Sequence, residues 1–292
     1  MNSATLAHAT GGANAPPASM GEDPMSYEYI LVKRPAQRVA SITLNHPPRL
    51  NAINGHMLRE LDRAVRRIER DDEVRAWLLT GAPRPDGRPC FSAGVDLKAV
   101  NEGVRLDRHL GPRVTNTIDD MLKPSIAVLD GIASTGAIEL ALACDFRLVG
   151  AQAAISDWHL KHLGSGVGSW GSPARWLSLV GPSVTKEMIL TAKVMNADEA
   201  VATGFATARY PSEELYGQAL DMAGTMAGMN PDGVSQALAH IQQSGARERD
   251  HSLSLATQVR QWFGSTETFG ERARKVMAER GNRQGAQKSE SD

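Results

Sequence analysis

The chain has 292 residues, with 32 Lys and Arg against 33 Asp and Glu, and is long enough to bury a substantial core in one large domain or two smaller ones. The net charge of -1 provides no global field that would favour nucleic acid or an anionic membrane, and no apolar run approaches the ~20 residues of a membrane span. Two cysteines, Cys90 and Cys144, form no disulfide framework or metal-ligand spacing, which fits a reducing compartment.

The first 25 residues are expected to form a flexible tail. They are rich in Ala, Gly, Pro, Ser and Thr and carry few large apolar side chains, so burial cannot repay the entropy of ordering them. The segment lacks the basic start and apolar centre of a secretory signal, so we expect a cytoplasmic protein. Met25 stands where the globular pattern begins, and the sequence leaves open whether translation starts there or at Met1.

A hairpin and an amphipathic helix are predicted next. Residues 29–32 and 39–44 alternate with a period of two, with a turn near Pro35 and Ala36. Asn54 can cap a helix whose charged face, which includes Glu60, is interpreted as solvated. The apolar positions of that helix recur at steps of three and four: Met57, Leu61, Ala64, Val65 and Ile68.

The middle of the chain repeats an order of strand, turn and helix. We expect residues 98–113 to form a polar, lid-like or substrate-facing segment. Strands are expected at 74–80, 125–129 and 146–149, a loop at 81–88, and helices at 114–122 and 138–143. This order suggests stacked ββα units.

Helices are expected to dominate the C-terminal third. Ser183, Asn196 and Ser212 are candidate helix caps, and Asn196 with Glu199 has capping-box spacing. A helical apolar stripe follows, formed by Leu215, Ala219, Met222, Ala223 and Met226. Residues 281–292 are expected to be a second flexible tail.

Two glycine-containing turns carry the chemical argument. The first is Phe91-Ser92-Ala93-Gly94-Val95-Asp96-Leu97, and the second runs from Asp130-Gly131 through Thr135-Gly136-Ala137 to Glu139-Leu140. Glycine and alanine let backbone N–H groups approach a ligand closely, at points where a helix can begin and direct its positive end outward. Two such donors facing one another would form an oxyanion hole.

These turns resemble the crotonase (enoyl-CoA hydratase/isomerase) superfamily pattern, A-G-x-D-L followed about forty residues later by N-G-x-x-x-G-G-G-x-E. Asp130 replaces the asparagine, and Thr135 and Ala137 replace the outer two glycines, while Gly136 is kept. The segment Leu44-Asn45-His46-Pro47-Pro48-Arg49-Leu50-Asn51-Ala52 also resembles the family's entry to its first helix. The resemblance covers the chain from about residue 27 to residue 281.

The resemblance implies an α/β fold, a crotonase-like spiral of ββα units over residues 26–205. It further implies a C-terminal helical region over residues 206–280 that packs on the core and between the subunits of a homotrimer or a dimer of trimers. From the residues alone, the apolar stripe fits a plain core face equally well.

The resemblance also implies the site. The backbone N–H groups of Val95 and Gly136 match the oxyanion donors, and the alternative is that these glycine turns are only structural. Lys98 is a weaker candidate for a phosphate contact, because an exposed lysine also has an ordinary solvated role. The loop that meets the adenine of coenzyme A is matched by Ser92, Ala93, Gly94 and Asp96.

Glu139 matches one of the two catalytic glutamates of the hydratases, and its alternative role is an acid held by a helix N-terminus. The second glutamate is absent, because Trp158 and His159 stand at the family's Pro-Glu positions. Asp157 or His159 could serve as acid or base with Glu139, and Trp158 could wall the acyl pocket. A hydrogen-bonded structural histidine is an equally good reading.

Three other interpretations fit the residues less well. The Trp-His pair is similar to the aromatic acyl-CoA dehalogenase branch, but that branch's nucleophilic aspartate is not found in residues 164–171. Residues 166–171 satisfy G-x-G-x-x-G, but no clear βαβ unit surrounds them and Trp170 is an awkward neighbour for a pyrophosphate. Asp157, His159 and His162 lack a further ligand cluster, so no metal is expected.

We therefore predict an enoyl-CoA hydratase/isomerase-like lyase of fatty acid metabolism that stabilises a thioester enolate. Its partner is an acyl-CoA substrate, with no cofactor apart from that coenzyme A and with no nucleic-acid or membrane partner. One alternative is a hydrolase of the same fold that cleaves a carbon–carbon or thioester bond. The other is a non-catalytic acyl-CoA binder.

Overall fold

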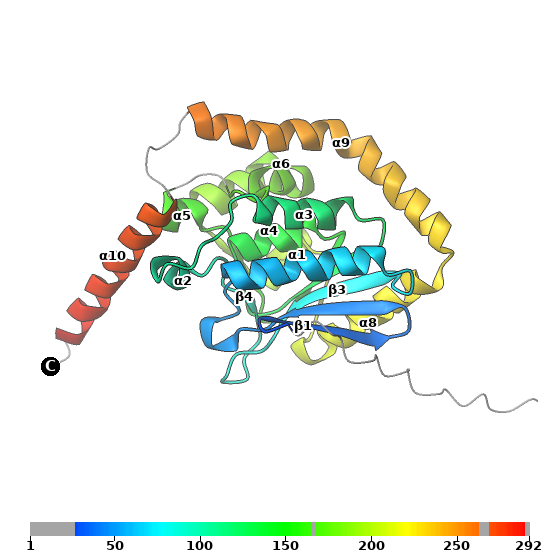
Figure 1. The fold of residues 1–292 in the computed structure, drawn as a ribbon, viewed down its shortest axis with the longest axis horizontal. Coiled ribbons are helices and arrows are strands. Elements are labelled where there is room, and N and C mark those ends of the chain that lie inside the picture. Colours follow the sequence, from blue (N-terminus) through cyan, green and yellow to red (C-terminus); the bar gives the residue numbers. More distant parts are fainter. Residues whose placement is uncertain (1–26, 165–167, 263–268, 290–292) are drawn as a thin grey trace, which may run out of the picture.

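The computed structural model describes residues 27–164, 168–262 and 269–289 (Figure 1). The expected N-terminal tail, residues 1–25, lies outside the described residues, as does part of the G-x-G-x-x-G segment. At the other end, helix α10 (Phe269–Ser289) continues through most of the expected tail at 281–292, so the backbone there is helical up to Ser289. Among the described residues, no helix combines the length and apolar character needed to cross a bilayer.

The predicted hairpin is confirmed, with a shifted turn. Strands β1 (Ile30–Ala36) and β2 (Val39–Leu44) pair antiparallel, with Ile30 opposite Leu44. Pro35 and Ala36 belong to β1, and the turn is made by residues 37–38, where Arg38 has a φ of 61°. Strand β1 lies at the edge of its sheet, where a proline without an N–H group is tolerated. A short 3₁₀ helix η1 (Pro47–Arg49) follows the hairpin.

Helix α1 (Gly55–Arg70) begins where predicted. The Asn54 side chain accepts hydrogen bonds from the backbone N–H groups of His56 and Met57, at 2.9 Å each. All five predicted apolar positions are buried. Glu60 is a correction, because this residue of the expected solvated face is buried and accepts from the N–H groups of Glu28 at 2.9 Å and Tyr29 at 2.8 Å.

The ββα repeat is confirmed, because the two strands of each unit belong to two different sheets. The first strand of each unit joins a six-stranded sheet in the order β1-β2-β3-β5-β7-β10, and the second joins a four-stranded sheet in the order β4-β6-β8-β9. Neighbours are parallel except for the pairs β1–β2 and β8–β9. The units are β3 (Ala76–Gly81) with β4 (Cys90–Ser92), β5 (Ser125–Leu129) with β6 (Ile132–Ser134) and α4 (Gly136–Ala143), and β7 (Phe146–Gly150) with β8 (Ala154–Ser156) and α5 (His159–Leu163).

The segment expected to be a polar, lid-like stretch contains regular structure. Helix α2 (Leu97–Asn101) begins directly after the first glycine turn, and α3 (Leu110–Asp120) begins four residues before the expected start at 114. Leu110 and Gly111 are buried, so the first turn of α3 is held by packing. The polar composition of residues 98–113 concealed these contacts.

Two of the three predicted caps are corrected. Ser183 lies inside α6 (Ser172–Leu190), which is broken at Gly181, where φ is 73°. Pro211 is the N-cap of α8 (Ser212–Gly228), so Ser212 is its first helical residue. The capping box of Asn196 is confirmed, with its side chain accepting from the Glu199 N–H at 2.9 Å. The remaining elements here are β9 (Val194–Met195), α7 (Ala197–Ala202) and β10 (Ala208–Tyr210).

Helix α8 covers one face of the six-stranded sheet, and the predicted stripe supplies the contact. Leu215, Ala219 and Ala223 are buried against strands β2, β3, β5 and β7, while Met222 and Met226 are partly buried there. Helix α9 (Pro231–Trp262) then arches over α6, and α10 packs beside α2 and α5 (Figure 1). Strand β10 extends the six-stranded sheet beyond the boundary expected at residue 205.

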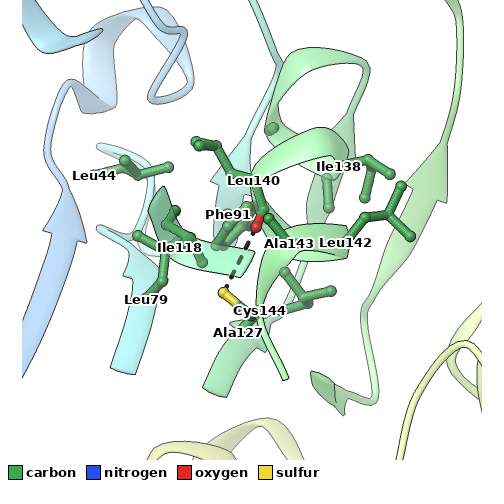
Figure 2. Close-up of a cluster of buried hydrophobic side chains, with 14 of the residues drawn as sticks. Leu44, Leu79, Phe91, Ile118, Ala127, Ile138, Leu140, Leu142, Ala143 and Cys144 are labelled. Carbon is green, nitrogen blue, oxygen red and sulfur yellow. Dashed lines mark hydrogen bonds between the residues drawn. The ribbon is translucent and has the colours of Figure 1, made fainter. Parts of the chain in front are cut away.

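The core beneath the second glycine turn is organised by α4. All eight residues of this short helix are buried, among side chains from β2, β3, β4, β5 and α3 (Figure 2). At the C-terminal end of α4, Nη1 of Arg147 donates to Ala141 O at 3.2 Å and to Cys144 O at 2.6 Å. Burial raises the pKa of the Cys144 thiol to about 12 and that of the Cys90 thiol to about 11, so both are inert at neutral pH.

Candidate active site

The structure brings the two glycine turns into direct contact. Gly94 has a φ of 89°, and a Cβ placed on it would lie 1.9 Å from Thr135 Oγ1 and 2.7 Å from Ser134 O. Only glycine fits this position, for reasons of both backbone conformation and space. Thr135 itself has a φ of 47°, an uncommon value for a threonine. The predicted convergence of these two segments is therefore present.

The two candidate oxyanion donors lie on the two sides of this contact. A Cβ on Gly136 would be 3.2 Å from Val95 Cγ2, so the two residues are neighbours. Val95 follows Gly94, and Gly136 is the first residue of α4, where backbone N–H groups have no intrahelical partner. Among the residues that the structure describes, neither N–H donates a hydrogen bond to another protein group.

Side chains of the first turn are used to hold the loop. Ser92 is fully buried, and its hydroxyl donates to Asn51 O at 2.7 Å and accepts from the Gly94 N–H at 3.2 Å. Asp96 caps α2 by accepting from the Ala99 N–H at 2.9 Å. Both side chains therefore hold the loop in place, and its role as the segment that meets the adenine of coenzyme A stays a prediction. The Ala93 N–H is likewise bonded within the protein, and Lys98 is exposed.

Sequence reasoning assigned no role to Asn51, which anchors the strand leading into this turn. It is fully buried, has a φ of 51°, and its Oδ1 accepts from the His46 N–H at 2.9 Å. Its amide nitrogen donates to three carbonyls, those of Ala82, Cys90 and Phe91. Asparagine adopts the left-handed conformation more often than most residues, so an asparagine just before the first helix could have indicated a turn of this kind.

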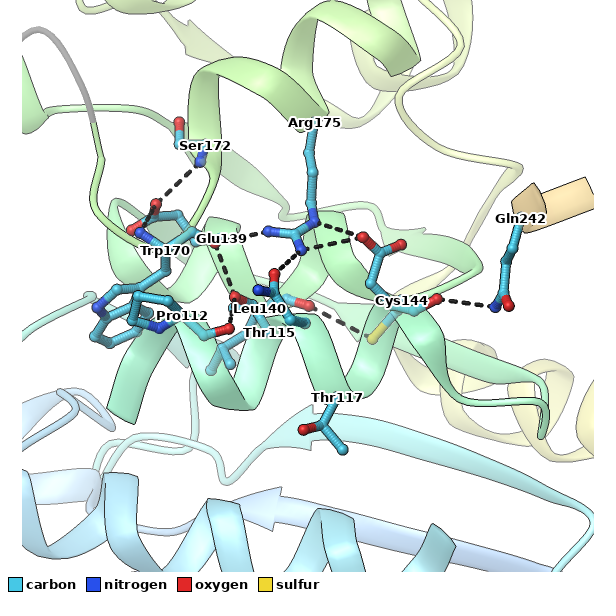
Figure 3. A network of polar contacts seen from close by, with 12 residues as sticks. Pro112, Thr115, Thr117, Glu139, Leu140, Cys144, Trp170, Ser172, Arg175 and Gln242 are labelled. Atoms are coloured by element: carbon cyan, nitrogen blue, oxygen red, sulfur yellow. Dashed lines mark hydrogen bonds and ion pairs between the residues drawn. The ribbon is translucent and has the colours of Figure 1, made fainter. Parts of the chain in front are cut away.

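Glu139 lies in the first turn of α4 and is 1% exposed. Its Oε1 accepts from the backbone N–H groups of Trp170 at 2.7 Å and Ser172 at 3.0 Å, so the start of α6 fixes the carboxylate (Figure 3). Its Oε2 lies 3.4 Å from Nε2 of His159. The carboxylate therefore has one oxygen held by amides and one oxygen beside an imidazole.

His159 and Asp157 continue this chain of polar groups. Nδ1 of His159 is 2.7 Å from Oδ1 of Asp157. The other Asp157 oxygen accepts from the Ser172 hydroxyl and from the Trp176 indole N–H at 3.2 Å. The structure thus joins three of the five predicted catalytic residues, Glu139, His159 and Asp157, in one buried network.

The charges of this network favour a protonated histidine. Burial alone lowers the pKa of His159, but the attraction of Glu139 and the hydrogen bonds with Asp157 and Glu139 outweigh it and raise that pKa to about 10. Burial would raise the pKa of Asp157, but the hydrogen bond and charge of His159 bring it below its usual value. An imidazolium between two acids is the expected state at neutral pH.

Trp158 points elsewhere. Its indole N–H donates to Ala192 O at 3.0 Å, and its ring lies 4.7 Å from Lys161 Nζ and 5.1 Å from the His162 ring. These contacts lie outside the Glu139–His159 network, and the role of Trp158 as an acyl wall stays a prediction.

Arg175 is a second residue that sequence reasoning missed. It is 5% exposed, and it donates to Trp170 O at 2.6 Å, to Asn116 Oδ1 at 2.8 Å and to Asp119 Oδ2 at 3.1 Å (Figure 3). It ties α6 to α3 directly behind Glu139. Among the described residues, no group of three or more His, Cys, Asp and Glu side chains could hold a metal ion.

Comparison with known proteins agrees with this geometry. The chain matches the family described as enoyl-CoA hydratase/isomerase over residues 34–284. It is 30% identical to the short-chain-enoyl-CoA hydratase of Clostridium acetobutylicum over 227 residues, covering 76% of this chain and 84% of that protein.

Solved structures show the same likeness. An enoyl-CoA hydratase/isomerase from Xanthobacter autotrophicus Py2 superposes with a TM-score of 0.74 at 27% identity, covering 88% of this chain and 99% of that one. A monofunctional enoyl CoA isomerase from M. smegmatis gives a TM-score of 0.63 at 26% identity, covering 74% and 93%. The fold and family predicted from the two glycine turns are confirmed: this chain belongs to the enoyl-CoA hydratase/isomerase family.

Proposed function

We propose that this protein, an acyl-CoA enzyme of the enoyl-CoA hydratase/isomerase type, polarises the thioester carbonyl of a 2-enoyl-CoA between the N–H groups of Val95 and Gly136. Glu139 then acts as the acid/base at the neighbouring carbons. The observation that carries the proposal is a pair of N–H groups, in two touching turns, that donate no hydrogen bond within the part of the chain that the structure describes. Glu139 lies in the same helical turn as Gly136.

The two amides would act on the carbonyl oxygen. As water adds to carbon 3, negative charge moves onto the thioester oxygen to form an enolate, and two fixed N–H donors stabilise that charge without reorganisation. Loss of one such donor typically costs about 3 kcal/mol of activation free energy. The N-terminus of α4 adds its positive dipole end at the Gly136 donor.

Glu139 would move the proton. Its Oε1 is held by two backbone N–H groups, and Oε2 faces the His159 imidazolium. A carboxylate oxygen has two lone pairs, so Oε2 would use the second one to accept the proton of the attacking water. The proton is then returned to carbon 2 of the enolate. Moving a double bond needs the same two parts, an enolate hole and one acid/base, so isomerisation is the second candidate function.

For the hydrolase alternative, the described residues of the network offer no serine or cysteine nucleophile. The hydroxyl in the network belongs to Ser172, which is fully buried and donates to Asp157, so it is not placed as a nucleophile. The two cysteine thiols are inert at neutral pH because burial raises their pKa values.

The test is the hydration of crotonyl-CoA by the full-length protein and by Glu139→Gln. Glutamine keeps an oxygen that can accept from Trp170 and Ser172, so the fold is retained while the acid/base is removed. We expect kcat to fall by about 10²–10⁴. Glu60→Gln is the matched control, because Glu60 is a buried glutamate that also accepts two backbone N–H groups but lies at α1.

The outcomes separate the candidates. Full activity in Glu139→Gln would remove Glu139 from the mechanism. A wild-type protein that binds thioesters without turning any over would be the non-catalytic binder. Conversion of a 3-enoyl-CoA without hydration would select the isomerase.

We also propose that the protein forms trimers or pairs of trimers in the cytoplasm and needs no cofactor beyond the coenzyme A of its substrate. Exposed apolar side chains on α6 and at β9 support an assembly, with Leu177, Leu190 and Val194 exposed by 45%, 65% and 48%. Sedimentation equilibrium of the full-length protein tests the stoichiometry, and a monomeric mass would contradict it.

A further inference from the structure

Trp170 fills the space between α3 and the start of α4. A Cβ on Gly111 would lie 2.0 Å from Trp170 Nε1, and a Cβ on Gly136 would lie 3.0 Å from Trp170 Cζ3. One edge of the indole thus rests on a glycine of α3, and the opposite edge rests on the glycine that supplies an oxyanion donor. Any larger residue at either glycine would displace the ring.

The backbone of Trp170 is fixed from both sides. Its N–H donates to Glu139 Oε1 at 2.7 Å, and its carbonyl accepts from Thr115 Oγ1 at 2.8 Å and from Arg175 Nη1 at 2.6 Å (Figure 3). Arg175 is held in turn by Asp119. Trp170 is 3% exposed, so the ring is packed and its backbone is clamped. We therefore treat the Trp170 side chain as a fixed wall of the site.

The position of the Trp170 ring relative to the reacting atoms determines how much space is open to the acyl chain. The six-membered edge of the Trp170 indole lies at Gly136, and the backbone N–H of the same residue binds Glu139. The ring therefore flanks an acyl group whose carbonyl lies at Gly136 N and whose next carbons reach Glu139. We propose that the Trp170 indole blocks the continuation of the acyl chain beyond Glu139, which restricts the enzyme to short-chain thioesters of about four carbons. This inference rests on the proposed function.

The first measurement is the chain-length profile of the full-length enzyme on 2-enoyl-CoA substrates of four, eight and twelve carbons. A hydrophobic wall discriminates by about 10–200-fold per methylene that it rejects. We therefore expect kcat/KM for the twelve-carbon substrate to be at least about 100-fold below that for the four-carbon substrate. Equal values for the two substrates would overturn the proposal.

The second measurement removes the wall. Trp170→Val keeps the backbone N–H that Glu139 accepts and should raise kcat/KM for the twelve-carbon substrate relative to the four-carbon one by about tenfold or more. If this variant fails to fold, Trp170→Phe, which retains a smaller ring, should shift the preference toward the eight-carbon substrate. The control is Trp77→Phe, a fully buried tryptophan of β3, which should leave the ratio unchanged.

The outcomes for this inference and for the proposed function are distinguishable. If no thioester is turned over, calorimetry can still compare the affinities for saturated four-carbon and twelve-carbon acyl-CoA. These affinities show whether Trp170 limits the length of the bound acyl chain. A preference for the four-carbon ligand that is lost in Trp170→Val supports it. Equal affinities, or a ratio that Trp77→Phe changes as strongly as Trp170→Phe does, would overturn it.

Discussion

Oε2 of Glu139 and Nε2 of His159 lie 3.4 Å apart, so the acid at the start of α4 faces the imidazole at the start of α5. His159 stands at the position where the family resemblance places a second glutamate. The site therefore pairs one carboxylate with a histidine that Asp157 orients, where two carboxylates were expected in the hydratases. This exchange changes how the site responds to pH.

The first prediction concerns the stability of the fold between pH 7 and pH 10. The folded pKa of His159 is raised from 6.5 to about 10, so its charge contributes stability that is fully present below about pH 6.5 and is lost as the pH rises through 10. His159→Gln leaves two buried acids without their cation and should cost about 3–5 kcal/mol at pH 7. In urea unfolding at pH 7, 8.5 and 10, the free energies of unfolding of the wild type and of His159→Gln should converge as the pH rises. A difference that stays constant would show that a charged His159 does not stabilise the fold.

A second prediction concerns Ser172, which contacts both acids. Its N–H binds Glu139 at 3.0 Å and its hydroxyl donates to Asp157. Ser172→Ala keeps the N–H and removes the hydroxyl, so unfolding should become easier by about 1–3 kcal/mol. Because Asp157 loses a donor, the pKa of His159, followed by NMR, should also change. Ser244→Ala, an exposed site on α9, is the control, and an unchanged histidine titration in Ser172→Ala would contradict the coupling.

A third prediction separates collision from backbone strain at Gly94. Both Gly94 and Gly204 have positive φ, at 89° and 78°, but a Cβ meets Thr135 and Ser134 only at Gly94 and open space at Gly204. Gly94→Ala should push the two turns apart and abolish turnover, while Gly204→Ala should cost about 1 kcal/mol of stability with turnover retained. Crotonyl-CoA hydration and thermal unfolding of both variants check this. Retained activity in Gly94→Ala would show that turn contact is not required.

Asn51 provides a fourth prediction. Replacing it with alanine removes a buried donor from the carbonyls of Ala82, Cys90 and Phe91, and we expect a loss of about 2–4 kcal/mol in the free energy of unfolding. The loop before Gly94 should loosen, which hydrogen exchange of the amides at residues 90–94 would show. Unchanged protection there would mean that other contacts hold the loop.

The sequence predicted the parts of the fold and site that follow from local rules. Period-two alternation located the hairpin, Asn54 and Asn196 located helix starts, and the small residues around Gly94 and Gly136 located the two turns. In each case the feature depends on contacts between residues only a few positions apart in the sequence. Membership of the family followed from the order and spacing of the same turns.

What the sequence could not show depends on contacts between distant segments. Trp170 meets Gly111 from 59 positions away, and Thr115 and Arg175 clamp its backbone. Asp96 was expected to close the first turn, and the structure adds that it also caps the helix that follows it. The polar stretch 98–113 concealed the start of α3, because the burial of Leu110 depends on neighbours that pattern alone does not reveal.

The account depends most directly on polarisation of the thioester carbonyl by Val95 and Gly136. The infrared band of that carbonyl, recorded with a carbon-13 label in an enoyl-CoA bound to Glu139→Gln, measures this without turnover. Two amide donors should move the band of the bound ligand to lower frequency than the band of the same thioester in water. A bound thioester whose carbonyl band stays at its value in water would contradict the oxyanion hole.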